Sequence, residues 1–428
     1  MIYPYQQAGA EWLAARRTAF LADEMGLGKT VQAIRGADII GAKKILVICP
    51  AVARIQWARE FERWQTISRD VFPWVKNQSF SRITDHDVTI CSHEALVNRL
   101  LARTLCRPWD LVVVDEAQAF KTNTAKRTIA LYGRGSILAE GKRVWLLSGT
   151  PMPNHPGELW THLHTLFGDS RPYHEFLNRY CIVVAGDYGP RIMGSRNVSE
   201  LKERLRPHIL RRRATEVLKD LPPITFGHVA IRVSSANAHA VDLLALQIGT
   251  LDPEALLANG SEHIAAIRRT IGELKAPVVA ELILGELTAD PKQKLVCFAW
   301  HLGVLDKIEE QCRVLGVVRI DGSTTPVARQ KAIDSFQDNP ETRLFLGQIK
   351  ACSTAITLTA AHHVVLAEAS WTPGDNVQAA KRCHRIGQTR PVLARFVTLD
   401  GTIDDAVNRV LARKARMLTE LWDNQEES

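Results

Sequence analysis

The chain has 428 residues, of which 46% are hydrophobic and 23% charged, so it is long enough for about three ordinary domains or two large ones. This composition is typical of a folded globular protein and excludes disordered, collagen-like and disulfide-stabilised classes. Lys and Arg outnumber Asp and Glu by 54 to 46, a basic balance that is compatible with a polyanionic partner.

The sequence has no run of about 18 apolar residues, no signal peptide at its start, and no C-x-x-C pair among its eight cysteines. We therefore expect a cytoplasmic protein with reduced thiols, without a membrane span and without a structural zinc site.

Short runs of branched apolar residues recur along the chain and alternate with helical stretches. Continuous apolarity is typical of strands that are buried on both faces of a parallel sheet. In the first half the expected strands are Ala19–Ala22, Ile45–Ile48, Val88–Ile90, Leu111–Val114 and Val144–Leu147. In the second half they are Leu295–Phe298, Val317–Ile320, Leu344–Leu346, Val364–Leu366 and Leu393–Val397. The pattern predicts an α/β fold with two lobes, each with its own sheet.

The segment between the two sets of strands, from about Gly157 to Leu287, has mostly the pattern of helices. The expected helices are Glu200–Leu205, Val241–Leu246 and His263–Leu287, followed near the end of the chain by Thr402–Leu421. The Pro222-Pro223 pair interrupts this segment and marks the expected passage from the first lobe to the second.

The sharpest motif is DEMGLGKT at Asp23–Thr30, which follows the first expected strand and precedes an expected helix at Val31–Ile40. In this context glycines let the backbone approach a phosphate, and the N–H groups and dipole of the helix start favour its negative charge. Lys29 would reach the β- and γ-phosphates of ATP, and the Thr30 hydroxyl would bind Mg²⁺. The full set of expected loop contacts is Asp23, Glu24, Met25, Gly26, Leu27, Gly28, Lys29 and Thr30. A glycine-rich turn before an ordinary helix is the alternative, which the flanking strand and helix disfavour.

A pair of carboxylates, Asp115 and Glu116, follows directly on the strand Leu111–Val114. Because the carboxyl ends of parallel strands meet at one edge of a sheet, we expect this pair beside the phosphate loop. Asp115 would hold Mg²⁺, directly or through water, and Glu116 would polarise the attacking water. Taken alone, such a pair can be no more than a strand end, and the phosphate loop is what favours a catalytic role.

Two arginines, Arg382 and Arg385, lie three residues apart in the segment QAAKRCHRIGQ. On a helix they would share a face, and two guanidiniums aimed at one point suit the charge that develops in phosphoryl transfer. The alternative is a solvated basic helix face, which this segment by itself favours.

Together these segments resemble one family over nearly the whole chain, the Swi/Snf-type ATPases, which are helicase-like DNA translocases of superfamily two. The family's own loop is D-E-x-G-L-G-K-T, which accounts for Asp23 where a strict phosphate loop has glycine. The other matching segments are Pro4–Gln6, Ile45–Trp64, Asp115–Thr122, Leu147–Pro151, Leu210–Pro223, Ile320–Ser323 and Trp371–Gln388, which ends in the family's H-R-I-G-Q.

The resemblance implies two RecA-like lobes, each a parallel sheet flanked by helices, with helical protrusions between them. It implies lobe one at 1–155, its protrusion at 156–225, a protrusion of lobe two at 226–290, and lobe two at 291–428. The implied catalytic residues are Lys29, Asp115, Glu116, Arg382 and Arg385, with Gln6 as the adenine contact. The implied coupling residues are Gln118, Ser148, Thr150 and Gln378, and weaker candidates for DNA contacts are Ser92, Arg319 and Ser323.

Two features are similar to the subgroup of fork-remodelling, strand-annealing enzymes: Arg269–Pro277 (RTIGELKAP) and Glu368. The clearest departure is Lys350–Leu358, where Cys352, Ser353 and Ala355 replace family glycines, so weaker coupling between ATP and DNA is expected. The resemblance implies a monomeric motor without accessory domains, as in bacteria or phages, associated with the nucleoid. It leaves open whether an unknown partner protein targets the motor.

We therefore expect an ATP- and Mg²⁺-dependent translocase on double-stranded or forked DNA. A strand-separating helicase on DNA or RNA is one alternative, and a nucleic-acid clamp that binds ATP but scarcely hydrolyses it is another. Trp57, Phe61 and Trp64 have the spacing of a buried helix face, so we expect them in the core rather than stacked on bases. One smaller question stays open at this stage. The run Arg211–Arg213 could grip phosphates, sense the lobe interface or simply be solvated.

Overall fold

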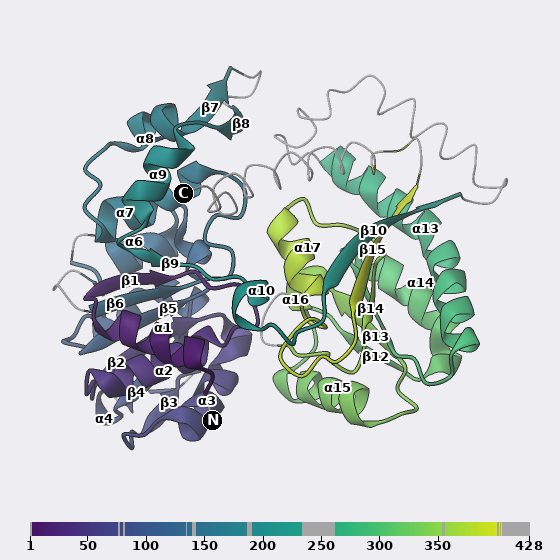
Figure 1. Cartoon of the computed structure of the whole chain (residues 1–428), viewed down its shortest axis with the longest axis horizontal. Coiled ribbons are helices and arrows are strands. Elements are labelled where there is room, and N and C mark those ends of the chain that lie inside the picture. The colour runs from purple at the N-terminus through teal and green to yellow at the C-terminus, as the bar shows by residue number, and fades with distance from the viewer. Residues whose placement is uncertain are drawn as a thin grey trace. The chain divides into compact units, whose positions relative to one another are not determined.

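The computed structural model describes residues 2–75, 78–79, 82–133, 135–138, 143–185, 191–232, 262–352, 356–399, 402 and 404. They form two compact units (Figure 1), which divide in the sequence between Lys219 and Asp220, just before the expected boundary at Pro222. Among the described residues, Val184, Ala185 and Arg191 depart from this order, because they are grouped with the second unit. Each unit is described by itself below.

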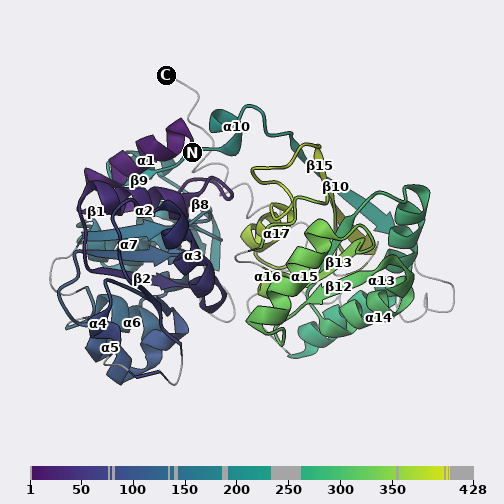
Figure 2. The same ribbon diagram turned by 90° about the horizontal axis from the view of Figure 1, so that it is seen from below.

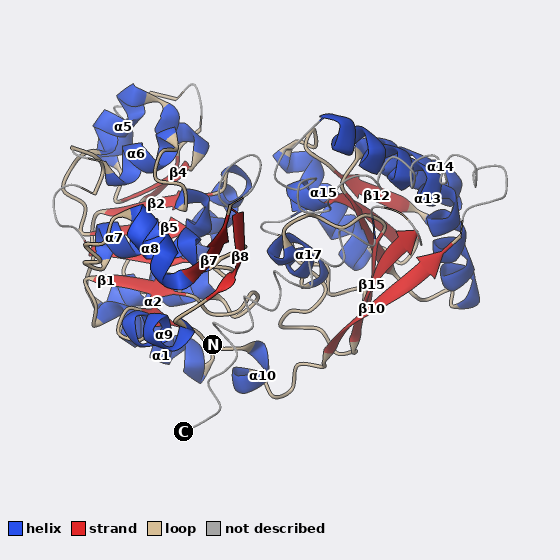
Figure 3. Cartoon of the chain, turned by 90° about the horizontal axis from the view of Figure 1, so that it is seen from above, coloured by secondary structure: helices blue, strands red, loops and turns tan. Residues whose placement is uncertain are grey.

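The first unit is built on a sheet of seven strands in the order β3-β4-β2-β5-β6-β1-β9 (Figure 3), and every neighbouring pair in it is parallel. The strands are β1 (Thr18–Leu21), β2 (Ile45–Cys49), β3 (Val71–Pro73), β4 (Val88–Ser92), β5 (Leu111–Asp115), β6 (Arg143–Leu147) and β9 (Ile209–Leu210). The five strands expected in this half are confirmed, and the short edge strands β3 and β9 were not predicted.

Helices cover both faces of this sheet because successive strand residues point to opposite sides. On one face, Leu21 and Trp145 pack with α1 (Pro4–Ala14), α2 (Lys29–Ile39) and α3 (Arg54–Trp64). On the other, Phe20 and Val112 pack with α4 (Arg82–Asp85), α5 (Arg99–Leu105) and α6 (Lys126–Tyr132). The predicted helix after β1 is confirmed. Trp57 and Phe61 of α3 are buried, as expected of a core face.

After β6 the chain leaves the sheet and returns only at β9, beside β1. The excursion contains η4 (Pro156–Leu159), α7 (Trp160–Leu166), α8 (Tyr173–Tyr180), β7 (Cys181–Val184), β8 (Arg191–Ser195) and α9 (Val198–Leu205). It has its own small core of Met152, Leu159, Trp160, Leu163, Phe176, Tyr180, Leu201 and Leu205. The helix expected at Glu200–Leu205 is confirmed, but the largely helical interpretation of this region missed β7, β8 and β9, which are short and only partly buried.

The second unit is built on a sheet of six parallel strands in the order β10-β15-β14-β11-β13-β12. The strands are β10 (Ile224–Ile231), β11 (Leu295–Ala299), β12 (Val317–Ile320), β13 (Leu344–Gln348), β14 (His363–Leu366) and β15 (Val392–Leu399). All five strands expected in this half are confirmed. Strand β10 was missed because it lies at the edge of the sheet and is mostly exposed or half-buried.

Two layers of helices enclose the second sheet (Figure 2). One layer is α13 (Glu262–Ala289) and α14 (Leu302–Cys312), and the other includes α15 (Pro326–Asp338), α16 (Ile349–Cys352) and α17 (Pro373–Ala380). The helix expected at His263–Leu287 is α13, which packs on the second sheet, and β10 is a strand of that sheet. A protrusion within 226–290 would therefore fall at 233–261, outside the described residues, as do Val241–Leu246 and most of Thr402–Leu421. The domain boundaries stay a prediction.

The arrangement confirms the predicted fold class, two α/β lobes that each carry a parallel sheet flanked by helices. Among the helices that the structure describes, none has the length and apolarity needed to cross a lipid bilayer. The described part of the chain also holds no cluster of three or more His, Cys, Asp or Glu side chains suited to a metal ion.

A buried histidine in the first unit predicts how its stability depends on pH. His162 on α7 lies against Phe20, its Nδ1 is 3.0 Å from the Tyr132 hydroxyl, and burial lowers its pKa from 6.5 to about 4. The unfolded chain therefore binds a proton between these pH values while the folded chain does not. Acidification from pH 6.5 to 4 should cost the folded state up to about 3 kcal/mol through this one group.

The measurement is the free energy of unfolding of wild type and His162→Gln at pH 7.5 and at pH 4.5. The stability advantage of the wild type should shrink at the lower pH. The exposed His174 is the matched control, and His174→Gln should leave the pH dependence unchanged. An equal stability advantage of the wild type at both pH values would contradict the lowered pKa of His162 in the folded state.

Candidate functional site

The phosphate-loop candidate lies between β1 and α2 of the first unit. Gly26 and Gly28 have φ angles of 85° and 71°, in the left-handed region that glycine adopts without strain, and Gly28 caps α2. The Lys29 ammonium donates to the backbone carbonyls of Asp23 and Glu24 at 2.8 and 3.1 Å, so the side chain folds back over the loop. Backbone N–H groups at the start of a helix bind anions favourably. Left-handed glycines followed by the start of α2 are therefore the local geometry expected of a phosphate loop.

The residues of the loop differ in where their side chains go. The Asp23 carboxylate is fully buried and pairs with Arg212, while a Glu24 carboxylate oxygen accepts the backbone N–H of Ala214 at 2.6 Å. A Cβ on Gly149, in the segment after β6, would lie 2.5 Å from Met25 Cγ, so that segment touches the loop. Asp23 and Glu24 thus bind other parts of the protein through their side chains.

Gln6, the expected adenine contact, lies directly against the loop. Its side-chain amide donates to the Leu27 carbonyl at 3.3 Å, and a Cβ on Gly28 would lie 2.3 Å from the same nitrogen. Its carbonyl oxygen accepts the backbone N–H of Tyr3 at 3.0 Å, which fixes the amide orientation. The structure brings Gln6 to the predicted nucleotide loop, and its contact with adenine stays a prediction.

The carboxylate pair ends β5, at the same edge of the sheet as the loop after β1, because all the strands are parallel. Asp115 is half-buried and accepts from the Trp57 indole N–H at 2.8 Å and from the backbone N–H of Glu116 at 2.9 Å. Burial and the neighbouring charge of Glu116 raise the pKa of Asp115 to about 7. Glu116 itself has a φ of 48°, an uncommon left-handed conformation for a residue with a side chain.

A chain of side chains leads from Glu116 to the segment after β6. The Gln118 amide donates to Glu116 Oε2 at 2.7 Å, and its carbonyl oxygen accepts from the Ser148 hydroxyl at 2.6 Å. The Ser148 oxygen in turn accepts the backbone N–H of Thr150 at 3.0 Å. The structure thus brings together three of the four residues predicted to couple hydrolysis to motion. The fourth, Gln378, belongs to the second unit and lies buried on α17.

Sequence analysis missed two neighbours of the carboxylate pair. Trp57 was assigned to the core, where it does lie, but its indole N–H also binds Asp115. His93 is buried after β4, and its Nε2 is 2.8 Å from the carbonyl oxygen of Asp115. The only signal for Trp57 was its place in the family's second motif, and His93 carried none. Both residues hold the end of β5 in place.

The donor set at this edge is suitable for Mg²⁺. Carboxylate and hydroxyl oxygens are the ligands that this hard cation prefers, and a nearby cation would favour the ionised form of Asp115. Asp115 and Thr30 as the residues that would hold the ion stay a prediction.

The arginine segment of the second unit differs from the expectation of a shared helix face. Helix α17 ends at Ala380, and Lys381–Gln388 forms a series of turns, so Arg382 and Arg385 are not on one helix. The Gln388 amide ties these turns down by donating to the carbonyls of Thr359, Ala361 and Cys383 at 3.2, 2.9 and 3.0 Å.

The two arginines also differ in exposure. Arg382 is 3% exposed, whereas Arg385 is half-buried and makes longer hydrogen bonds, 3.3 Å to the Lys381 carbonyl and 3.4 Å to the Thr357 hydroxyl. Their common role at the γ-phosphate stays a prediction, in which Arg385 is the more accessible group.

The three weaker candidates for DNA contacts lie at the carboxyl ends of strands or on an edge strand. Their polar groups form hydrogen bonds or ion pairs within the protein. The Ser92 hydroxyl is buried and accepts the N–H of Ala95 at 3.3 Å. Both the hydroxyl and the N–H of Ser323 donate to Asp321. Arg319 is surrounded by carboxylates, at 2.6 Å from Asp306, 3.0 Å from Glu309 and 3.0 Å from Asp321. This placement adds no support to the predicted contacts.

The unusual segment Lys350–Leu358 is described only in part. Lys350 is exposed and Cys352 is buried in α16, while Ile356 and Leu358 pack into the core of the second unit. Ser353 and Ala355 lie outside the described residues, so the effect of the replaced glycines stays a prediction.

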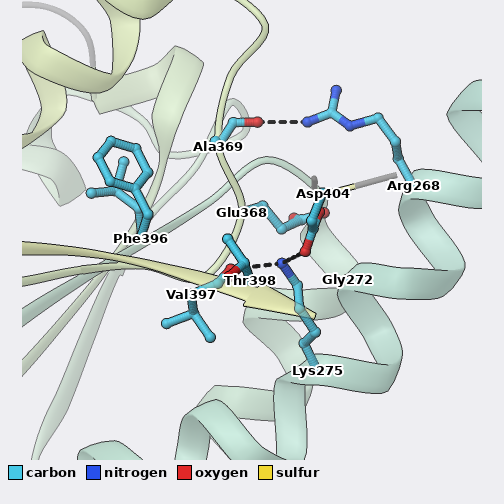
Figure 4. A pocket seen from close by; sticks show the side chains of 10 residues that line it. Arg268, Gly272, Lys275, Glu368, Ala369, Phe396, Val397, Thr398 and Asp404 are labelled. Carbon is cyan, nitrogen blue, oxygen red and sulfur yellow. Dashed lines mark hydrogen bonds and ion pairs between the residues drawn. The ribbon is translucent and has the colours of Figure 1, made fainter. Parts of the chain in front are cut away.

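The two features that suggested the fork-remodelling subgroup meet in one small polar pocket of the second unit (Figure 4). A Cβ on Gly272 of α13 would lie 2.4 Å from Glu368 Oε1, so glycine is needed where the helix passes this side chain. Glu368 accepts the backbone N–H groups of Trp300 and His301, both at 2.9 Å, and lies 2.7 Å from His301 Nδ1. Lys275, one turn further along α13, donates to the Val397 carbonyl at 3.0 Å and to Asp404 at 2.7 Å.

These contacts predict that Lys275 is a stability residue of the second unit. The Lys275→Met variant is expected to lower the free energy of unfolding by about 3 kcal/mol, because it leaves the Asp404 carboxylate without its charged partner. Lys307, which is half-exposed and pairs with Glu273 at 3.3 Å, is the matched control. Lys307→Met should change stability by no more than about 0.5 kcal/mol. Denaturant unfolding of both variants is the measurement, and equal stabilities would rule out the buried anchor.

Comparisons with known proteins agree with this geometry. A family model described as "SNF2-related domain" matches residues 5–265, and one described as "Helicase conserved C-terminal domain" matches residues 275–387. The first covers the loop and the carboxylate pair, and the second covers both arginines.

Curated relatives match almost the whole chain. The chain is 30% identical to "SWI/SNF-related matrix-associated actin-dependent regulator of chromatin subfamily A-like protein 1" of Drosophila melanogaster, over 98% of this chain and 56% of the relative. It is 32% identical to "DNA annealing helicase and endonuclease ZRANB3" of Bos taurus, over 97% of this chain and 40% of the relative. Less than two thirds of each relative is thus covered. Among solved structures, "Sulfolobus solfataricus SWI2/SNF2 ATPase core in complex with dsDNA" is similar with a TM-score of 0.46 and 23% identity, over 99% of this chain and 93% of the other.

The first model matches more than half of the chain, and it contains the nucleotide loop, the carboxylate pair and the hydrogen-bonded path from Glu116 to the segment after β6. The chain therefore belongs to the SNF2-related family.

Proposed function

We propose that this protein is an ATP-driven motor on double-stranded DNA. The observation that carries the proposal is the convergence, at one edge of the first sheet, of the loop with Lys29 and Thr30 and the pair Asp115 and Glu116. Membership of the SNF2-related family and the match to a helicase C-terminal domain support it. Relatives are named as a DNA annealing helicase and as a regulator of chromatin, which favours DNA as the partner and forks or annealing as its setting.

The residues of the first unit have different roles in hydrolysis. Lys29 and the N–H groups at the start of α2 bind the phosphates, and Mg²⁺, held by Thr30 and Asp115, would neutralise charge on the phosphate oxygens. Glu116 orients and polarises the attacking water. Gln118, which donates to Glu116, ties that carboxylate to Ser148 and so to the segment after β6. A change at the catalytic carboxylate therefore has a direct hydrogen-bonded route to a second loop.

The second unit supplies Arg382 and Arg385 to the same ATP in this proposal. Guanidiniums bind best while the γ-phosphate is present, so ATP favours one arrangement of the units and hydrolysis releases it. Repetition of this cycle advances the motor along DNA that is held mainly through its phosphates, without reading of the base sequence.

The test is steady-state ATP hydrolysis without nucleic acid and with duplex, forked and single-stranded DNA and RNA. We expect strong stimulation by duplex or forked DNA, and loss of hydrolysis in Lys29→Ala. Stimulation by single strands or RNA alone would instead favour the strand-separating helicase. Absence of stimulation by every nucleic acid would contradict the motor. Triplex displacement, compared with strand displacement on a tailed duplex, then separates translocation from unwinding.

A further inference from the structure

The side-chain cluster beneath the nucleotide loop has no part in the hydrolysis described above. It is centred on Arg212, which follows β9 at the point where the chain returns from its excursion. Arg212 donates to Asp23 Oδ1 from Nε at 3.0 Å, to Gln32 Oε1 from Nη2 at 2.7 Å, and to the carbonyl of Tyr5 from Nη1 at 2.6 Å. Its guanidinium also lies over the Tyr5 ring, at 5.4 Å. One side chain thus joins α1, the loop and α2.

The partners of Arg212 are the groups that shape the loop. Asp23 is fully buried, and its backbone carbonyl is one of the two that accept the Lys29 ammonium. Gln32 donates to Asp23 Oδ2 at 3.0 Å and to the Leu27 carbonyl at 3.2 Å. The Tyr5 hydroxyl also donates to the Leu27 carbonyl, at 3.2 Å. The guanidinium therefore binds the Asp23 end of the loop directly and reaches the Leu27 end through Gln32.

The backbone of α1 passes close to this cluster at Gly9. A Cβ on Gly9 of α1 would lie 1.8 Å from Gln32 Oε1 and 2.7 Å from Arg212 Nη2. A side chain at Gly9 would therefore displace the ends of Gln32 and Arg212, although glycine in a helix interior is otherwise unfavourable relative to alanine. This steric requirement is independent of the hydrogen bonds and points to the same arrangement.

We propose that Arg212 is a positioning residue for the nucleotide loop, which acts through Asp23 and Gln32 to hold the loop in the shape that binds ATP. In this role Arg212 acts through these residues and not on the ATP phosphates themselves. Its function is to keep the Asp23 and Leu27 carbonyls in a fixed place, and through the Asp23 carbonyl also Lys29. Because Arg212 directly follows the strand that closes the excursion, the position of that strand is transmitted to the loop. The inference rests on ATP being the ligand of the loop, as in the proposed function.

The test is equilibrium binding of a fluorescent ATP analogue with Mg²⁺, together with the KM for ATP and kcat at saturating DNA. Arg212→Ala should raise the dissociation constant and the KM at least tenfold, with kcat changed less than threefold. Arg212→Lys, which keeps the charge but loses the fork, should recover only part of the affinity. The matched control is Arg206→Ala, since its side chain is 79% exposed in the same segment, and it should bind ATP as the wild type does.

Gly9→Ala provides a second test in case Arg212→Ala fails to fold. It leaves every charge in place and should favour the helix, yet it should weaken ATP binding at least tenfold by displacing Gln32 and Arg212. Wild-type affinity in both Gly9→Ala and Arg212→Lys would overturn the inference, as would a loss of kcat with KM unchanged. Failure of the wild type itself to bind ATP would instead overturn the proposed function and this inference with it.

Discussion

Arg385→Ala is expected to reduce ATP turnover by about 10³-fold or more, with little change in DNA affinity, as for other arginines that stabilise phosphoryl transfer. Arg385 is half-buried, and it donates at 3.3 Å to the Lys381 carbonyl and at 3.4 Å to the Thr357 hydroxyl. The loss in Arg385→Ala should appear in kcat, because the proposed role of this group is in phosphoryl transfer. Arg382→Ala is expected to lower stability as well, because that side chain is buried.

The experiment for Arg385 combines DNA-stimulated hydrolysis with DNA binding at fixed salt. Arg385→Lys retains the charge without the planar fork and should stay impaired by about 10²-fold or more, since guanidinium and ammonium are not interchangeable at a bidentate site. The exposed Arg390 is the matched control, and Arg390→Ala should hydrolyse ATP normally. A decrease of less than tenfold in Arg385→Ala would mean that Arg385 does not stabilise the transition state.

Glu116→Gln should slow hydrolysis by about 10²- to 10⁴-fold while ATP still binds. The substituted amide is isosteric with the carboxylate, so the left-handed backbone at this position and the contact with Gln118 can persist, but it cannot accept a proton from water. Loss of the negative charge at Glu116 should also lower the pKa of Asp115, because that charge is one of the causes that raise it.

Single-turnover hydrolysis and equilibrium ATP binding separate an effect on the hydrolysis step from an effect on ATP affinity. Glu94 is the matched control, because it is exposed and carries the same charge near the same strand ends. Glu94→Gln should hydrolyse ATP within about twofold of wild type, as expected for a surface substitution. Normal hydrolysis in Glu116→Gln would exclude Glu116 as the residue that activates water, and loss of ATP binding would place it in the binding site instead.

Ten strands could be predicted from their apolar runs, nine of them inside a sheet and one, β12, at an edge. The edge strands β10 and β9 could not be predicted, because β10 is mostly exposed or half-buried and β9 has only two residues. The shared helix face of Arg382 and Arg385 was predicted wrongly, because spacing does not reveal that Gln388 holds three carbonyls and turns the chain after Ala380. Local patterns thus predict elements well and their ends poorly.

The loop and the carboxylate pair were predictable because each has a local motif. The contacts between Trp57 and Asp115 and between Arg212 and Asp23 join positions that are 58 and 189 residues apart in the sequence. Neither pair follows from spacing. The first depends on β2 lying beside β5, and the second on β9 returning beside β1. For the run Arg211–Arg213 the three interpretations considered were all incomplete, since Arg212 is an internal support.

The contact between Trp57 and Asp115 has a practical consequence. Indole emission responds to a hydrogen bond and to a charge beside the ring, and this ring lies 2.8 Å from the carboxylate proposed to hold Mg²⁺. The protein therefore carries an intrinsic optical reporter at its catalytic edge. Although the chain has ten tryptophans, the difference in emission between wild type and Trp57→Phe isolates the signal of this one ring. Arrival of nucleotide and metal can then be followed in real time without any attached dye.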